Sequence, residues 1–337
     1  MEKQEINKLI SAGKFLNVCD HPELVETHIS WVILCNRFVY KVKQPMKYSF
    51  LDFSTLKKRK YFCEKELKLN QRLTENMYLD IQPVRQSPEG INLGLNEGEI
   101  IDYAVRMRRM DEKKQMDVLL SKNKVSGSDI QNIAQQIAAF HLNACCIYKK
   151  EVRNIQKKFN ALAEQKSYLY EHLGAESRDI IDKAVEVNMN FIGKHNDLLL
   201  ARLRLGFFRD VHGDLHSRNI FLLPEPVIFD CIEFNDDYRQ IDVLNEVAFL
   251  CMDLEAFGRP DLSKLFIKTY NNLFPCMQTK EEKSLFIYYK CYRANVRAKV
   301  NSLRSKNADN EQRKKALAET EKYLRLMDSY VSMLLAE

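Results

Sequence analysis

The chain has 337 residues, which is long enough for two lobes that each bury a hydrophobic core. A hydrophobic content of 45% and a charged content of 29% are ordinary for a soluble globular protein. The nine cysteines are odd in number and include no C-x-x-C pair, which argues against a disulfide framework and against a zinc site and fits a reducing cytoplasm.

The net charge of +6 is modest, but its distribution is uneven. Residues 37–72 contain eleven Lys or Arg and three acidic residues, whereas residues 225–261 contain ten acidic residues and two Arg. Such an acidic stretch is not typical of a nucleic-acid-binding protein, so we expect no nucleic-acid partner. It favours metal binding and a cationic substrate, although a single acidic residue more often lies on a solvated helix face.

No apolar run approaches the length that spans a bilayer, and residues 1–16 are polar and lack the core of a signal peptide. We therefore expect a soluble, cytoplasmic protein without a membrane partner.

In chain order, the first elements are β-strands. Residues 31–34 and 37–43 are rich in β-branched and aromatic side chains and are joined through Cys35-Asn36, which predicts a hairpin. A helix is predicted from Ser54, a suitable N-cap, to Leu73. Two more strands are predicted near residues 81–84 and 100–107, with a turn region between them.

After residue 111 the pattern becomes mainly helical. Helices are predicted near residues 113–121, 128–145, 151–172, 176–203, 239–256, 261–274, 280–304 and 309–336. The last of these is amphipathic, and we expect it to pack onto its own lobe rather than to bind a partner. The sequence thus predicts an α+β protein with a small antiparallel-sheet lobe and a large helical lobe.

The most informative motif is His212-Gly213-Asp214-Leu215-His216-Ser217-Arg218-Asn219, with Asp230 eleven residues after Asn219. This order of residues, an aspartate, an asparagine five positions later and a second aspartate, is typical of enzymes that transfer a phosphoryl group. In such enzymes the first carboxylate orients a hydroxyl. The amide and the second carboxylate hold Mg²⁺ against the phosphates of ATP. Residues 220–223 and 227–229 read as two strands joined at Pro224-Glu225-Pro226. This hairpin would bring Asp230 back beside the loop.

The motif resembles the catalytic loop of the aminoglycoside phosphotransferase-like kinases, which also include choline and fructosamine kinases and have H-G-D where protein kinases have H-R-D. Within them the chain is similar to a largely uncharacterised bacterial subgroup, over roughly residues 20–305. The runs that carry this similarity are T-H-I-S-W at 27–31, F-L-D-F-S at 50–54, F-D-C-I-E-F-N-D at 229–236 and Y-R-A at 292–294. Some members of the subgroup carry an additional P-loop domain, whereas this sequence contains no G-x-x-x-x-G-K-[ST].

The resemblance implies a bilobal protein-kinase-like fold, with a nucleotide-binding lobe at residues 1–110 and a helical lobe with the catalytic loop and substrate site at residues 111–337. The lobes would join near Met107 to Asp111 and enclose the nucleotide, with Met107 beside it. It also implies that Asp214 is the catalytic base or the group that orients the acceptor. Asn219 and Asp230 would bind Mg²⁺, which prefers hard oxygen ligands.

Each of the two histidines of the loop has two alternative roles. The resemblance implies that His212 is structural, with direct acid–base use as the alternative. His216 stands where protein kinases often have a lysine near the γ-phosphate; it either contacts the phosphate or is a scaffold for Asp214.

In the first lobe a lysine should contact the α- and β-phosphates and pair with a carboxylate on the following helix. Strand alternation places Lys41 and Lys43 on the same face, so pattern alone does not choose between them. Comparison with the family's strand favours Lys41. Glu66 is its expected partner, and Glu64 is the alternative.

Two further acids, Glu233 and Asp242, follow the motif. Glu233 either contacts a second metal or the substrate, or has a surface hydrogen-bonding role. Asp242 matches a position that family members use to support the catalytic loop from below, so we expect it to be buried.

One departure from kinases concerns the glycine-rich G-x-G-x-x-G loop, which the first strands lack. The corresponding turn would be residues 27–30, where backbone amides and the hydroxyls of Thr27 and Ser30 would meet the phosphates.

We therefore predict an ATP- and Mg²⁺-dependent kinase that phosphorylates a hydroxyl of a small molecule, and the acidic stretch makes an amine-bearing or aminoglycoside-like acceptor the first to try. The alternative is a nucleotide-binding regulatory protein without significant turnover. A protein substrate is less favoured, because no A-P-E segment follows Asp230. The sequence leaves open ATP against GTP, the acceptor and the oligomeric state.

Overall fold

The computed structural model describes residues 1–48 and 50–336. The chain forms two compact units, the first made of Met1–Leu119 and Arg218–Arg239 and the second of Leu120–Ser217 and Gln240–Glu337. The motif at residues 212–219 thus contains the point, between Ser217 and Arg218, where the chain passes from the second unit back into the first. Residues 218–239, which we had assigned to the second lobe, pack with the first unit, while the division into a nucleotide-binding and a substrate-binding lobe stays a prediction.

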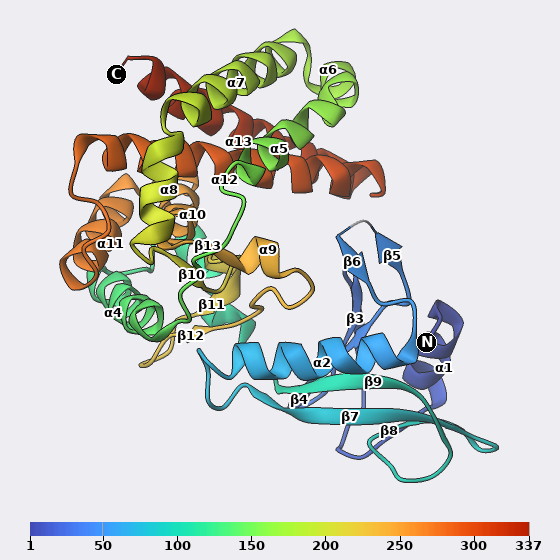
Figure 1. The fold of residues 1–337 in the computed structure, drawn as a ribbon. Coiled ribbons are helices and arrows are strands. Elements are labelled where there is room, and N and C mark those ends of the chain that lie inside the picture. Colours follow the sequence, from blue (N-terminus) through green and yellow to red (C-terminus); the bar gives the residue numbers. More distant parts are fainter. Residues whose placement is uncertain (49, 337) are drawn as a thin grey trace. The chain divides into compact units, whose positions relative to one another are not determined.

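A seven-stranded sheet forms the centre of the first unit, in the order β1-β8-β7-β9-β4-β3-β2 (Figure 1). Neighbouring strands are antiparallel except for the parallel pair β1–β8. The strands are β1 (Lys14–Phe15), β2 (Glu23–Glu26), β3 (Ser30–Leu34), β4 (Phe38–Lys43), β7 (Tyr78–Ser87), β8 (Gly90–Leu93) and β9 (Glu99–Arg108). The predicted hairpin through Cys35-Asn36 is confirmed as β3–β4, whereas β8 lies in a stretch that we had assigned to a turn.

One helix packs on each face of this sheet. Helix α1 (Lys3–Ala12), which the sequence analysis did not predict, buries Ile6 and Leu9 in a core with Trp31 and Ile33. Helix α2 (Leu56–Asn70) packs against β9 and β7 on the opposite face (Figure 1). This division follows from the two-residue period of a strand, which sends successive side chains to opposite faces.

The start of α2 differs from the prediction by one residue. Thr55 is the N-cap, and its side chain accepts a hydrogen bond from the Lys58 N–H at 3.3 Å. The predicted cap, Ser54, instead donates its hydroxyl to Asp52. Both residue types cap helices well, so composition alone does not decide between neighbours.

Short elements complete the first unit and its connections. They are β5 (Lys47–Tyr48), β6 (Leu51–Asp52), η1 (Glu112–Lys114), α3 (Met116–Ser121), η3 (Ser217–Asn219), β11 (Ile220–Phe221), β12 (Val227–Ile228) and α9 (Asp236–Arg239). Strands β11 and β12 form the predicted hairpin, in slightly shorter form.

The second unit is mainly helical. Its helices are α4 (Gly127–Asn143), α5 (Asn154–Asn160), η2 (Ala161–Gln165), α6 (Lys166–Leu173), α7 (Ala175–Lys194), α8 (Asn196–Arg204), α10 (Val243–Ala256), α11 (Pro260–Leu273), α12 (Lys280–Lys306) and α13 (Asn310–Leu335). Strands β10 (Phe208–Asp210) and β13 (Gln240–Asp242) pair antiparallel at the start of α10.

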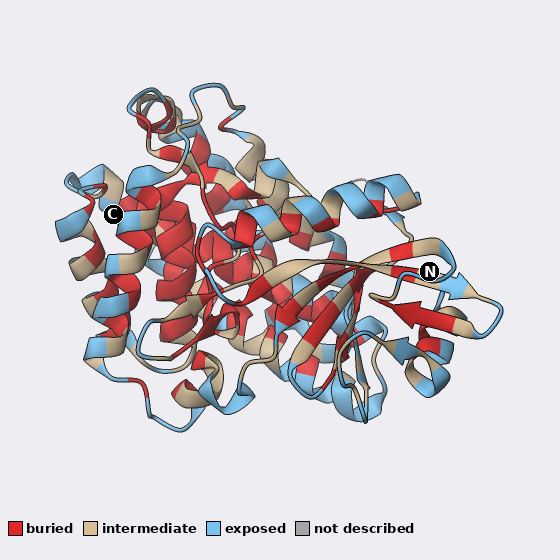
Figure 2. Cartoon of the chain, turned by 90° about the horizontal axis from the view of Figure 1, so that it is seen from below, coloured by how far each residue is buried: buried red, intermediate tan, exposed pale blue. Residues whose placement is uncertain are grey.

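Helix α10 is the centre of this unit, because residues 243–254 are all buried. It packs on α12 and α11, and α12 packs on α13. In Figure 2 the helices of the second unit are red where they face one another and pale blue outside. The C-terminal helix buries Tyr323, Leu324 and Met327 against its own unit, as predicted. Within the described residues, no helix has the length and apolar character needed to cross a membrane.

Candidate active site

A cluster of buried charges lies on the α2 side of the sheet in the first unit. The Lys41 Nζ atom is 2.8 Å from Glu66 Oε1 and 2.7 Å from Asp230 Oδ1. The Lys43 Nζ atom is 2.7 Å from the other oxygen of Glu66 and also donates to Glu233. Both lysines that the strand pattern could not separate therefore bind the same glutamate.

Exposure separates the two lysines. The side chains of Lys43 and Glu66 are fully buried, whereas the Lys41 side chain is 12% exposed and that of Asp230 is 44% exposed. The alternative partner Glu64 is exposed and stands 3.8 Å from Lys60. The open end of the cluster is thus the Lys41–Asp230 pair.

In this cluster, burial and the neighbouring lysine charges have opposite effects on the pKa values of the carboxyl groups. Burial by itself would raise the pKa of Glu66, but Lys41 and Lys43 outweigh it and lower the pKa to about 2. Burial raises the pKa of Glu233, which the neighbouring Lys43 offsets only in part. Glu233 is 3% exposed, so the expected surface role for it is wrong and its place is beside Lys43.

The hairpin β11–β12 positions the two candidate metal ligands. Its register pairs Ile220 with Ile228, and the Phe229 N–H donates to the Asn219 carbonyl at 3.0 Å. Asn219 and Asp230 consequently lie at the same end of the hairpin. This agrees with the expectation that the second strand returns the aspartate to the asparagine.

Asp230 has an unusual backbone conformation, with φ at +64°. Its N–H donates to the Tyr78 hydroxyl at 3.2 Å, and the next N–H, that of Cys231, donates to Asn70 Oδ1 at 2.9 Å. Side-chain-bearing residues rarely adopt this left-handed region, and where they do the surrounding contacts must hold them there. The buried side chains of Tyr78 and Asn70 supply those contacts.

Asn219 and Asp230 offer an amide and a carboxylate, which are hard oxygen donors suited to Mg²⁺. Among the described residues, no group of three or more His, Cys, Asp or Glu side chains could hold a metal ion by itself. Magnesium usually keeps several waters and is bound through one or two carboxylates together with substrate phosphates, so two protein ligands fit this ion.

In the second unit, two carboxylates of α10 hold the backbone of the motif loop. Glu246 accepts the N–H groups of His212 and Gly213 at 2.8 and 2.9 Å, one on each oxygen. Asp253 accepts both the N–H and the hydroxyl of Ser217 through its Oδ2 atom, at 2.8 and 2.5 Å. Glu246 and Asp253 thus bind the loop backbone before and after Asp214.

The carbonyl side of the loop is held from α12. The Arg293 guanidinium donates to the Gly213 carbonyl at 3.1 Å and to Asn245 Oδ1 at 2.7 Å. Burial would raise the pKa of Glu246, but the neighbouring His141, whose Nε2 lies 4.0 Å from the carboxylate, His212 and Arg293 outweigh it and lower the pKa. The loop is therefore fixed by ionised, buried partners, which make stronger hydrogen bonds than neutral ones.

Asp214 is the residue that this loop presents. Its side chain is 35% exposed, and one of its oxygens, Oδ2, is 3.3 Å from His216 Nε2. Burial would raise the pKa of Asp214, but His216, followed by Arg297 and His212, holds it well below its usual range. His212 is fully buried and its Nδ1 accepts the Asp214 N–H at 3.2 Å, which is the structural role expected for it.

Asp242 is buried as expected, but its contacts differ from the expectation. It binds the Arg202 guanidinium at 2.7 and 2.9 Å and caps α10 through the Leu244 N–H. Glu246 and Asp253, which the sequence analysis missed, hold the loop. Their spacing of seven residues, about two turns of a helix, and their place in a mainly apolar helix were the available signal.

Two predicted nucleotide-binding residues are buried in the first unit. Ser30 begins β3 after the turn at 27–30, and its buried hydroxyl has no hydrogen-bond partner among the described residues. Met107 is 6% exposed and packs in the core on the α2 side of the sheet. For both residues, contact with a nucleotide stays a prediction.

The comparisons with known proteins support the resemblance at the level of the fold. No family model matches the chain. Uncharacterised proteins of Mycobacterium tuberculosis and Mycobacterium bovis are 31% identical over 299 residues, which cover 85% of this chain and 56% of theirs. The chain thus spans about half the length of the curated relatives it matches.

Among solved structures, a choline kinase from Cryptosporidium parvum Iowa II matches with a TM-score of 0.55 and 12% identity, covering 93% of this chain and 90% of that one. The GDP complex of aminoglycoside 2'-phosphotransferase-IIIa matches with a TM-score of 0.51 and 12% identity, covering 91% and 93%. The chain has the α+β, bilobal protein-kinase-like fold of the aminoglycoside phosphotransferases and choline kinases, as the motif predicted.

Proposed function

We propose that the protein is an ATP- and Mg²⁺-dependent phosphotransferase that transfers the γ-phosphoryl group to a hydroxyl of a small molecule. The observation that carries the proposal is the set Asp214, Asn219 and Asp230 in a fold shared with small-molecule kinases: buried side chains hold the backbone around Asp214 and at Asp230, and the hairpin register places Asn219. A loop without a function would not need two buried, ionised carboxylates to hold its backbone. Nor would the hairpin after it need to end in an aspartate whose backbone is in the left-handed region.

In this proposal Lys41 contacts the phosphates of ATP, and Lys43 does not. Lys41 pairs with Asp230 at the partly exposed end of the cluster, so a phosphate can reach its ammonium group. Lys43 is fully buried between Glu66 and Glu233 and serves to fix Glu66. Asn219 and Asp230 would hold the Mg²⁺ ion, which neutralises charge on the phosphates when it is bound.

Asp214 would orient the acceptor hydroxyl and receive its proton as the oxygen attacks. Its lowered pKa makes it a weak base for a free alcohol, so orientation is its larger contribution and proton transfer occurs late. His216 is beside it and keeps the carboxylate ionised and directed.

The acceptor is proposed to be a small molecule with a hydroxyl and an amine. The proteins of known structure above are named for choline and for aminoglycosides, which are both cationic alcohols. The proposal includes a cytoplasmic location and no nucleic-acid partner, and it leaves ATP against GTP to the assay.

The test is ADP formation with ATP, Mg²⁺ and a panel of amino alcohols and aminoglycosides, comparing wild type with Asp214→Asn. We expect the variant to lose about 10²–10⁴-fold in rate, because orientation and proton transfer are both removed. Asp261→Asn is the matched control, since Asp261 is an exposed aspartate at the start of α11. Equal turnover by Asp214→Asn and wild type would refute the proposal.

The rival is a nucleotide-binding regulatory protein with little turnover, favoured by the absence of a glycine-rich loop. Calorimetry with ATP, with and without Mg²⁺, separates the two. Tight binding that does not depend on the metal, together with no phosphorylated product, would favour the rival.

A further inference from the structure

The segment between α1 and β2 is tied to the β3–β4 turn by a disulfide bond. Cys19 and Cys35 are joined with their Cα atoms 4.8 Å apart and are separated by 16 positions in the sequence. The other seven cysteines are free. The cysteine pattern argued against a disulfide framework and fitted a reducing cytoplasm, so one joined pair among nine cysteines needs a reason.

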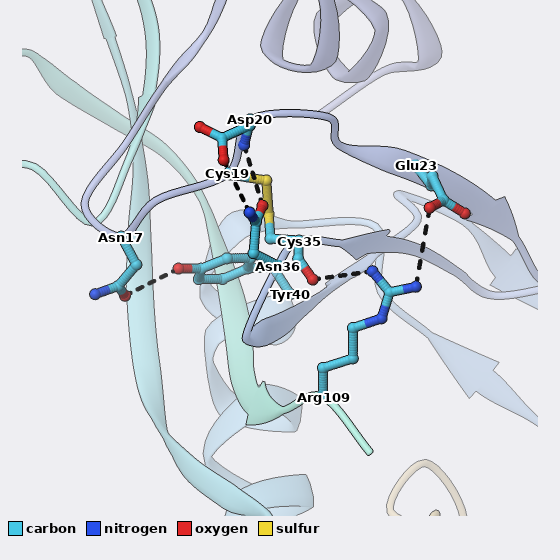
Figure 3. The surroundings of a disulfide bond; sticks show 8 residues. All are labelled: Asn17, Cys19, Asp20, Glu23, Cys35, Asn36, Tyr40 and Arg109. Atoms are coloured by element: carbon cyan, nitrogen blue, oxygen red, sulfur yellow. Dashed lines mark hydrogen bonds and ion pairs between the residues drawn. A yellow bond between two sulfur atoms is a disulfide. The ribbon is translucent and has the colours of Figure 1, made fainter. Parts of the chain in front are cut away.

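Apart from this bond, residues 16–22 are held by a few polar contacts (Figure 3). Asp20 and Asn36 exchange two hydrogen bonds, at 3.2 and 2.8 Å. Asn17 Oδ1 accepts from the Tyr40 hydroxyl at 3.1 Å and from the Arg106 guanidinium at 2.7 Å, and the Leu16 N–H donates to the Leu93 carbonyl at 2.9 Å. The apolar side chains of Leu16 and Val18 are 49% and 68% exposed. Segments with little buried apolar surface open at low free-energy cost. The disulfide bond is therefore expected to be what chiefly keeps residues 16–22 from opening.

The turn that carries Cys35 is also bonded to the chain directly after β9. The Arg109 guanidinium donates to the Cys35 carbonyl at 3.0 Å and lies 3.8 Å from Glu23 (Figure 3). In addition, the Arg109 N–H donates to the Arg37 carbonyl at 2.9 Å. The turn at residues 35–37 therefore connects the disulfide to the residues just after Met107.

We propose that the Cys19–Cys35 disulfide is a reversible redox switch that fixes residues 108–111 when oxidised and loosens them when reduced. Its effect on nucleotide affinity rests on the proposed function, since that stretch follows Met107. Cys35 is 1% exposed and Cys19 is only partly buried, so a dithiol attacks the Cys19 sulfur.

The chemistry of reduction is thiol–disulfide exchange. A thiolate of the dithiol bonds to the Cys19 sulfur, and Cys35 leaves as a thiolate that takes up a proton. The second thiol of the reductant then displaces Cys19, which is also protonated. The dithiol becomes a disulfide, and its two electrons reduce the protein bond to two thiols.

The first test is a thiol count on the full chain purified without reductant. After unfolding, alkylation and mass measurement, we expect seven modified thiols, and nine after treatment with dithiothreitol, in line with one bond and seven free cysteines. Nine modified thiols in the unreduced protein, also after exposure to oxidised glutathione, would overturn the proposal.

The second test is hydrogen exchange of the oxidised and reduced protein. We expect reduction to raise exchange several-fold in peptides that cover residues 16–22, 35–37 and 108–111, and to lower the Tm by roughly 5–10 °C. Cys19→Ser should behave as the reduced form with or without dithiothreitol. Unchanged exchange at residues 108–111 after reduction would overturn the switch, because the bond would then restrain only its own segment.

Two controls complete the design. Cys145→Ser removes an exposed free thiol of the second unit and should leave the redox response as in wild type.

ATP titrations of both redox states should give a several-fold weaker affinity after reduction, and an equal affinity would overturn the effect on nucleotide binding. If neither state binds ATP, the proposed function fails, while the thiol count and the exchange data still decide whether the switch exists.

Discussion

The two units hold their functional carboxylates in different ways. In the first unit Glu66, Asp230 and Glu233 are held by the ammonium groups of two lysines. In the second unit Glu246 and Asp253 are held mainly by backbone N–H groups and a hydroxyl. The first arrangement depends on charge at both partners, whereas the second depends on charge only at the carboxylate.

This difference has a consequence for what each region can do. An ion-pair cluster with one partly exposed end can exchange a protein partner for a ligand, as Lys41 would exchange Asp230 for a phosphate. Carboxylates bound to backbone amides cannot exchange partners without moving the chain. The first unit is thus suited to binding a charged ligand, and the second to keeping Asp214 in one position.

The largest effect is expected for Glu66→Gln, which removes the charge shared by both lysines. Buried ammonium groups that lose a partner are strongly destabilising, so the free energy of unfolding should fall by about 3–5 kcal/mol, measured by urea denaturation. The matched control is Glu64→Gln, two residues away on the same helix, which removes only an exposed pair with Lys60 and should change it by less than about 1 kcal/mol. Similar losses in the two variants would contradict the central place of Glu66.

The stability of the protein should also depend on pH through the ionisation of Glu66. The pKa of Glu66 is lowered from 4.5 to about 2, so its contribution is present at pH values above 4.5 and is lost as the pH falls through about 2. That contribution is on the order of 3 kcal/mol. Urea denaturation at pH values within this window should show a steeper loss for wild type than for Glu66→Gln. Parallel curves would show that Glu66 is not ionised in the folded protein.

A smaller effect on stability, with a larger one on turnover, is expected for Glu246→Gln. The amide of glutamine can accept from only one of the two loop N–H groups and presents its own N–H₂ to the other, which costs about 1–3 kcal/mol. Because the loop then shifts, kcat should fall while KM for ATP stays near the wild-type value. Glu171→Gln, at an exposed position of α6, is the control. A rise in KM alone would place Glu246 in nucleotide binding instead.

Local patterns in the sequence predicted much of the fold. The β3–β4 hairpin, α2, most helices of the second unit and the β11–β12 hairpin follow from periodicity and turn residues, which act over a few positions. Short or weakly patterned elements such as α1 and β8 were missed, because their apolar residues are few and are buried only by the sheet beside them. The charge pattern of residues 225–261 did not show which acids are buried, and of the four that are, namely Glu233, Asp242, Glu246 and Asp253, only Asp242 was expected to be.

The sequence by itself determined the order of the longer elements, the motif loop with Asp214 and Asn219, and the return of Asp230 at the end of a hairpin, because each depends on neighbours a few residues apart. Tertiary structure decided which groups each of the buried carboxylates binds. Glu66 was selected over Glu64 by the face that α2 turns to the sheet, and Glu246 and Asp253 became loop anchors because α10 is buried. A charge in a folded chain acts on whatever packing brings within hydrogen-bonding distance, and sequence separation does not encode that distance.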